Sequence, residues 1–231
     1  MKIGLILACA GEGRRLGFKK NKVFLYLNKK PIFYYSYKRF SSFSQIKWIC
    51  IVTQKKNFSL VKRTLPSEKR LILVEGGERR QDSVEAALKV LKDKDIDYII
   101  IHDGARPLIK KEKIKELILS LKKHPAVILG LPLKEAIKYV ERNFVVKSLR
   151  RENLYIIQTP QGFRKDLILK AYDKFNRKRI FYDDAQLVEL LRRKIKVIEG
   201  DPFNIKITYP ADLKLASLLL DRHCQQNCVN S

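Results

Sequence analysis

The sequence predicts an α/β fold with a mostly parallel sheet and helices on both faces. Short apolar runs alternate with stretches of helical period, which is typical of successive strand–helix units. The runs are apolar almost throughout, as expected for strands that are buried on both sides. The 231 residues are enough for a large core, and we assign 1–221 to a single domain and 222–231 to a disordered tail.

Six strands are predicted from the apolar runs, over residues 3–8, 48–53, 71–74, 98–101, 126–129 and 195–198. Three helices between or after them are predicted from apolar faces of helical spacing. These faces are Val84, Leu88 and Leu91, then Ile114, Leu117, Ile118 and Leu121, and then Leu167, Ile168, Ala171, Tyr172 and Phe175. Asp82 and Glu85 are expected to form a capping box at the start of the first helix.

The segment 132–149 interrupts this alternation. It has no helical face, but strand-like residues at 137–140 and 144–146 flank Glu141-Arg142-Asn143, which predicts a hairpin. A lone hairpin buries little apolar surface, so it needs something to pack against. A second subunit is the natural candidate.

The charge of the chain indicates an anionic partner. Lys and Arg number 49 against 24 Asp and Glu, which leaves a formal net charge of +25. Nucleic acid, a membrane surface and a phosphorylated small molecule are the candidate classes. No run of Lys and Arg exceeds three residues and the doublets are scattered from end to end, so specific nucleic-acid binding is not expected.

The chain is predicted to be cytoplasmic and not to span a membrane. Its longest stretch without Asp, Glu, Lys or Arg has eleven residues, far from the ~20 apolar residues of a spanning helix. The apolar run at 3–7 is also too short for a signal peptide. Four Cys in 231 residues do not make a disulfide framework.

A glycine loop follows the first strand and carries Ala10, Gly11 and Gly13, with Arg15 and Lys22 among the cations after it. Glycines let backbone N–H groups approach a phosphate closely, and fixed cations suit a triphosphate whose leaving group gains negative charge. The third glycine of a dinucleotide fingerprint comes one residue late, and no acidic residue stands at the ribose position. A tight turn followed by a solvated basic stretch is the alternative.

Two further motifs follow predicted strands. Gly76-Gly77-Glu78 leads to Ser83, for which a helix cap is the alternative interpretation. The second motif is His-Asp-Gly-Ala-Arg-Pro at 102–107. In it, Asp103 can coordinate Mg²⁺ or position a hydroxyl, and Arg106 can hold a phosphate. We expect His102 to pack beneath the site.

These motifs, together with Gln-Thr-Pro-Gln at 158–161 and Asn-Ile-Lys-Ile-Thr at 204–208, resemble the 2-C-methyl-D-erythritol 4-phosphate cytidylyltransferase family. The resemblance covers residues 2–220 and rests on five motifs in the same order and spacing. It implies a Rossmann-like fold, and a homodimer whose β-arm, here about 132–155, reaches the partner's site. It also implies transfer of CMP from CTP to the sugar phosphate, with Mg²⁺ or another divalent cation and with release of pyrophosphate.

The resemblance also assigns residues. Arg15 and Lys22 match the pair that stabilises the transition state. Matches to residues on the acceptor and phosphate side are Arg151, Lys206, Asp103, Arg106 and Thr159, with Arg151 supplied by the neighbouring subunit and Asp103 as a candidate metal ligand. Matches to CTP-contacting segments are Ala10, Gly11, Gly13, Gly77, Glu78 and Ser83.

Three positions depart from the family pattern. Asn21 stands where a Pro usually precedes the catalytic Lys, Glu135-Ala136 replaces Asp-Thr on the arm, and Arg150 replaces an Asp before Arg151. Ribitol-5-phosphate cytidylyltransferase, which shares the motifs, is the alternative reading.

Overall fold

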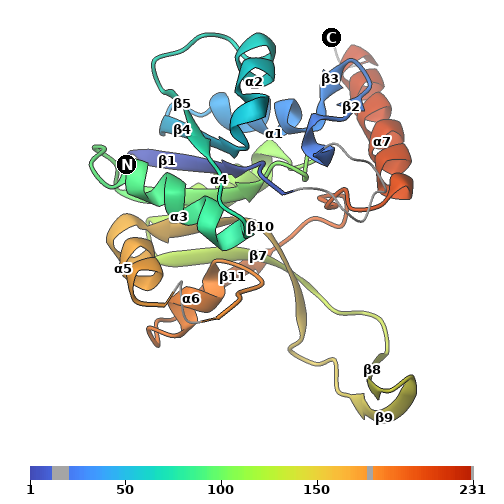
Figure 1. The fold of residues 1–231 in the computed structure, drawn as a ribbon. Coiled ribbons are helices and arrows are strands. Elements are labelled where there is room, and N and C mark those ends of the chain that lie inside the picture. The colour runs from blue at the N-terminus through green and yellow to red at the C-terminus, as the bar shows by residue number, and fades with distance from the viewer. Residues whose placement is uncertain (12–20, 176–178, 230–231) are drawn as a thin grey trace.

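The computed structural model describes residues 1–11, 21–175 and 179–229, with side chains of the last helix up to Leu220. Its centre is a seven-stranded sheet in the order β11-β7-β10-β6-β1-β4-β5 (Figure 1). The bounds are β1 Ile3–Ala8, β4 Ile46–Thr53, β5 Leu71–Glu75, β6 Tyr98–Asp103, β7 Ala126–Pro132, β10 Tyr155–Arg164 and β11 Lys196–Glu199. Only β10 among these seven runs antiparallel to its neighbours β6 and β7.

Helices cover both faces of the sheet, which confirms the predicted α/β class. One apolar cluster joins the sheet to α1 (Ile32–Ser41), α2 (Phe58–Thr64) and α4 (Lys111–Leu121). The other joins it to α3 (Arg80–Leu91), α5 (Lys165–Phe175) and α6 (Ala185–Glu189). Within β1, Leu5 and Leu7 belong to the first cluster and Ile6 to the second, because successive side chains of a strand point to opposite faces.

A smaller cluster packs the last helix against the start of the chain. It consists of Leu27, Ile32, Leu108, Ile207, Ala216 and Leu220, from α1, α7 (Pro210–Val229), the hairpin of β2 (Tyr26–Leu27) and β3 (Lys30–Pro31), and two loops. Helix α7 has the bounds Pro210–Val229. The division into a domain over residues 1–221 and a disordered tail over 222–231 stays a prediction from the sequence. The chain has no Gly or Pro after Pro210 that would end the helix earlier. None of the described helices is long and apolar enough to cross a membrane.

The central strand β10 was not predicted from the sequence. Gln158, Thr159, Pro160 and Gln161 interrupt its apolar pattern, and the register shifts between Gln158 and Gln161. A Pro inside a sheet is tolerated at such an irregularity, because there its missing N–H breaks no ladder bond. The expected capping box was also wrong: the helix begins at Arg80, and Asp82 accepts from the backbone N–H of Arg79 at 3.1 Å.

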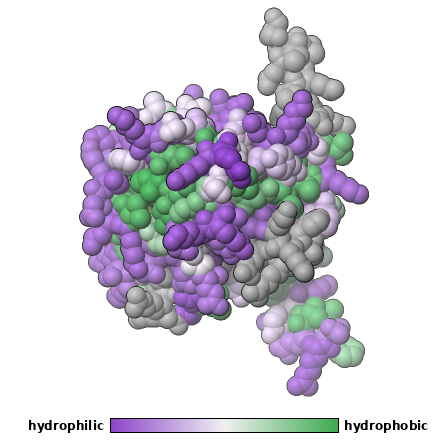
Figure 2. Space-filling view, turned by 45° about the horizontal axis from the view of Figure 1, so that its top comes forward, coloured by the Kyte–Doolittle hydropathy of each residue, from purple (hydrophilic) through white to green (hydrophobic). Residues whose placement is uncertain are grey.

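The predicted hairpin is present and projects from the body as an arm (Figure 1). Strands β8 (Ile137–Glu141) and β9 (Phe144–Leu149) pair antiparallel. Arg142 and Asn143 form the turn with φ of 46° and 69°, the signs that a tight two-residue hairpin requires. Phe144 is 76% exposed and Val145 61%, and Figure 2 shows apolar side chains on the separate arm.

Candidate active site

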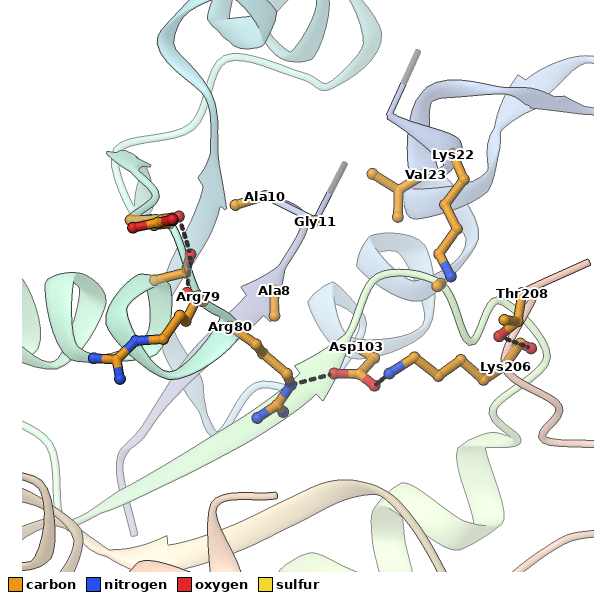
Figure 3. Close-up of a pocket in the computed structure, with 14 residues that line it drawn as sticks. Ala8, Ala10, Gly11, Lys22, Val23, Arg79, Arg80, Asp103, Lys206 and Thr208 are labelled. Carbon is orange, nitrogen blue, oxygen red and sulfur yellow. Dashed lines mark hydrogen bonds and ion pairs between the residues drawn. The ribbon is translucent and has the colours of Figure 1, made fainter. Parts of the chain in front are cut away.

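A cavity of about 420 Å³ lies beyond the carboxyl ends of β1 and β6, where ligands bind in open α/β sheets. The first turn of α3, a 3-10 turn over Lys22–Phe24 and the segment before α7 complete it. Its lining residues are Ala8, Ala10, Gly11, Lys22, Val23, Gly77, Glu78, Arg79, Arg80, Ser83, Asp103, Ala105, Lys206 and Thr208 (Figure 3). Ala10, Gly11 and Gly77 form a part of the lining with little or no side chain, here called the glycine wall, and Lys22, Arg79, Arg80, Asp103 and Lys206 supply its charges.

The glycine wall depends on close backbone packing. A Cβ on Gly76 would lie 2.4 Å from Cβ of Ala10 and 2.9 Å from Oγ of Ser83. Ser83 is buried, and its hydroxyl donates to the carbonyls of Gly77 at 3.3 Å and Arg79 at 3.1 Å. Ser83 therefore lies inside the first turns of α3 and is not a helix cap.

Asp103 forms the centre of the charged wall. Its Oδ1 lies 2.9 Å from Nε of Arg80, and its Oδ2 lies 2.6 Å from Nζ of Lys206 (Figure 3). Burial alone would raise the pKa of this carboxyl, but the charges of Arg80 and Lys206 hold the pKa well below its ordinary value. Asp103 is therefore an anion throughout the physiological range.

The backbone of Asp103 is held from beneath by two buried side chains. Its N–H donates to Oγ1 of Thr159 at 3.0 Å, and that hydroxyl lies 3.1 Å from Nδ1 of His102. Nε2 of His102 is 3.1 Å from the carbonyl of Arg106, which can only accept, so Nε2 carries the proton. Burial lowers the pKa of His102 to about 4. His102 is thus a neutral packing residue, as the sequence predicted.

Lys22 reaches the cavity from the 3-10 turn (Figure 3). Asn21 caps this turn: its Nδ2 donates to the carbonyl of Cys9 at 2.5 Å, and its Oδ1 accepts from the N–H of Val23 at 3.3 Å. Asn21, which departs from the family pattern, therefore connects the turn that carries Lys22 to the end of β1.

The segment that carries Lys206 is fixed to β10. Nδ2 of Asn204 donates to Oε1 of Gln158 at 3.2 Å and to the carbonyl of Thr159 at 2.9 Å. Nη1 of Arg106 donates to the carbonyl of Asn204 at 2.7 Å. Burial lowers the pKa of Arg106 from its ordinary value. Arg106 thus contacts the Lys206 segment and does not line the cavity.

The structure brings most of the sequence-predicted residues to one place. Those on the cavity wall are Lys22, Lys206, Asp103, Ala10, Gly11, Gly77, Glu78 and Ser83. Thr159 and Arg106 lie behind the wall and support Asp103 and Lys206. Arg151 is on the exposed arm, where its Nη1 donates to the carbonyl of Lys134. Arg15 and Gly13 lie outside the described residues.

Sequence reasoning missed Arg79, Arg80 and Thr208. The available signal was the doublet Arg79-Arg80, which follows Gly76-Gly77-Glu78. The sequence did not show which of the two arginines has a role at the site, because they differ only in their tertiary partners. Arg79 pairs with Asp82 in its own helix at 2.6 Å, whereas Arg80 pairs with Asp103 and, at 2.8 Å, with Asp184.

Comparisons with known proteins identify the family of the chain. Residues 3–222 match the family model described as 2-C-methyl-D-erythritol 4-phosphate cytidylyltransferase. A protein of that name from Caldanaerobacter subterraneus is 40% identical over 226 residues, covering 95% of this chain and 99% of its own. One from Bacillus mycoides is 36% identical over 220 residues, covering 94% and 96%.

The solved structures show the same likeness. The crystal structure of 4-diphosphocytidyl-2C-methyl-D-erythritol synthase from Anaerococcus prevotii has a TM-score of 0.83 and 30% identity, covering 95% of this chain and 98% of its own. Because the family model and the relatives match nearly the whole chain, the chain belongs to the 2-C-methyl-D-erythritol 4-phosphate cytidylyltransferase family.

Proposed function

We propose that this protein transfers CMP from CTP to 2-C-methyl-D-erythritol 4-phosphate and releases pyrophosphate. The observation that carries the proposal is a cavity that is lined both by the glycine wall and by Lys22, Lys206 and Asp103, in a chain of this family. Backbone without side chains admits a nucleotide closely, and the cations match its phosphates.

The reaction needs no protein nucleophile, because the acceptor's phosphate is itself an anion. Its oxygen attacks the α-phosphorus of CTP in line, the bond from that phosphorus to the bridging oxygen breaks, and pyrophosphate leaves with the electron pair. Lys22, together with Arg15, offsets the charge that spreads onto the phosphoryl and leaving oxygens. Lys206 and Asp103 orient the acceptor across the cavity.

The oxygen donors of the cavity fit Mg²⁺. Glu78 and Asp103 are its carboxylates, and Mg²⁺ is commonly held by one or two carboxylates together with substrate phosphates. Within the described residues there is no group of three or more His, Cys, Asp or Glu that would form a cage. Asp103 would therefore hold the ion jointly with the nucleotide. When bound, the ion neutralises charge on the phosphate oxygens.

The protein is proposed to act as a homodimer. A two-stranded hairpin with exposed Phe144, Val145 and Val146 is marginal alone, and exposed apolar clusters mark interaction surfaces. Arg151 contacts the carbonyl of Lys134 at the base of this arm and does not line the cavity of its own chain. A second copy would supply Arg151 to the acceptor side. The cytoplasmic location stays a prediction from the sequence.

The test is pyrophosphate release measured with CTP and each of two acceptors, methylerythritol 4-phosphate and ribitol 5-phosphate. We expect turnover with the first and the diphosphocytidyl product by mass spectrometry. The names of the relatives reported above favour this acceptor. Turnover with ribitol 5-phosphate and none with methylerythritol phosphate would contradict the proposal. ATP and GTP serve as controls, since purines should not fit the glycine wall.

A further inference from the structure

Arg80 lines the cavity and also pairs with Asp184, a buried carboxylate that does not line it. It is the first residue of α3, while Asp103 ends β6 and Asp184 precedes α6. Its Nη1 and Nη2 donate to the two oxygens of Asp184 at 3.0 and 2.8 Å, and its Nε donates to Oδ1 of Asp103 at 2.9 Å. One guanidinium thus bridges two carboxylates from separate elements.

Asp184 is a rigid anchor for this guanidinium. Its side chain is fully buried, and its Oδ1 also accepts from the hydroxyl of Tyr172 at 2.5 Å. Its backbone N–H donates to Oε1 of Gln161 in β10 at 3.2 Å. Asp184 does not line the cavity, so it has no direct access to a substrate there.

The neighbouring residue strengthens the anchor. Nε2 of Gln81 donates to the carbonyl of Arg179 at 3.0 Å, and its Oε1 accepts from the N–H of Phe181 at 3.0 Å. The first turn of α3 is therefore fastened to the chain around Phe181 and Asp184 by two adjacent side chains. Nη1 and Nη2 of Arg80 both donate to Asp184, and the planar guanidinium faces Asp103 with its Nε.

We propose that Arg80 is a positioning residue: anchored by Asp184, it fixes the direction in which the Asp103 carboxylate faces the reacting groups. Each carboxylate oxygen has two lone pairs, and Arg80 and Lys206 each occupy one. The remaining lone pairs then point in defined directions into the cavity. The inference rests on the proposed function, because Asp103 matters only if the reaction takes place there.

The test begins with the kinetics of Arg80→Lys and of the double variant Arg80→Gln/Asp184→Asn. Lys keeps the charge but lacks the planar fork that binds Asp184 through two hydrogen bonds, and the double variant removes both members of the buried pair while Asp103 keeps Lys206. We expect kcat to fall about 100-fold in the double variant and about tenfold in Arg80→Lys, since small misplacement of catalytic groups costs this much. The KM for CTP should stay within about twofold.

Asp184→Asn alone tests the anchor of Arg80, because Asp184 does not line the cavity and can change kcat only through Arg80. We expect its kcat to fall about tenfold, and the double variant to show no more than the loss of an Arg80→Gln chain. Arg70→Gln is the matched control: its side chain is 29% exposed against 28% for Arg80, and it also makes three hydrogen bonds, to Glu68, Ile46 and Ser41. It should lower Tm and leave kcat unchanged.

The outcomes are distinct. If the wild-type chain does not turn over CTP with the acceptor, the proposed function fails. If the wild type is active and the folded double variant keeps kcat within about threefold, the proposed function stands and the positioning role of Arg80 is wrong. A rise in the KM for CTP at unchanged kcat would equally overturn it.

Discussion

Nζ of Lys206 lies 2.6 Å from Oδ2 of Asp103, although α4, β7, the arm, β10, α5, α6 and β11 lie between the two residues along the chain. The pair places a cation and an anion side by side on the cavity wall. It also shows that the Asn-Ile-Lys-Ile-Thr motif at 204–208 folds against the motif that contains Asp103.

Lys206→Met should raise the KM for the acceptor about 10- to 100-fold, because a hydrogen bond to a charged group contributes about 1.5–3 kcal/mol. The KM for CTP should change much less. Steady-state kinetics with each substrate varied in turn measure both. Lys113→Met is a suitable control, since Lys113 pairs with Glu116 on α4 at 3.0 Å. Equal rises in both KM values would argue against an acceptor role.

Lys22→Ala should lower kcat about 100- to 1000-fold, the usual cost of removing a group that stabilises charge in the transition state. The circular dichroism spectrum and Tm should stay close to wild type. Lys30→Ala, on the neighbouring hairpin, is the control, because its ammonium lies over the ring of Tyr34 and does not line the cavity. A loss confined to KM would contradict the role assigned to Lys22.

Asn21→Gly should lower kcat about tenfold, because it removes the bonds to Cys9 and Val23 and loosens the turn that carries Lys22. Asn21→Pro should retain most of the activity, since Asn21 has a φ of −60°, close to the angle that proline fixes. Single-turnover rates at saturating substrates compare the two variants. Equal losses in both would show that the side-chain bonds, and not turn rigidity, decide the position of Lys22.

Arg151→Ala should raise the acceptor KM more than the CTP KM, and its neighbour Arg150→Ala serves as the matched control. If a second copy supplies the arm, mixing Arg151→Ala chains with Lys22→Ala chains should restore part of the activity. Each mixed dimer then has one site with both residues intact. Subunits are exchanged by mild denaturation and refolding before the assay. No recovery in verified mixed dimers would mean that the arm does not complete the partner's site.

The stability of the protein should fall as the pH drops from 7 to 5, in part because of His102. Burial lowers the pKa of His102 from 6.5 to about 4, so the unfolded chain takes up a proton in this range while the folded chain does not. Stability is fully present above the unfolded pKa and is lost between about 6.5 and 4, by at most about 3 kcal/mol. Urea unfolding at both pH values should show a smaller decrease in His102→Gln. An unchanged decrease would show that another group is responsible.

The strands and helices with clear periodicity were predictable from local sequence. Strand β1 was predicted with the bounds that the structure shows, and α3, α4 and α5 lie where their apolar faces indicated. β10 was not predictable, because Gln158, Thr159 and Gln161 are buried there by partners that are distant in the sequence, such as Asn204 and Asp183. Polar side chains inside a sheet contradict any local pattern until their hydrogen-bond partners are known.

The sequence by itself determined the fold class, the glycine-rich segments and two of the cations at the cavity, Lys22 and Lys206, because these depend on local periodicity, residue types and the order of the motifs. Only the tertiary structure decided which charges meet. It paired Asp103 with Arg80 and Lys206, and placed Arg106 and Thr159 behind the wall. Of the basic residues that the structure describes, Lys22, Arg79, Arg80 and Lys206 line the cavity. The interaction energy of two charges depends on the distance between them and on their burial, and both are set by the tertiary structure.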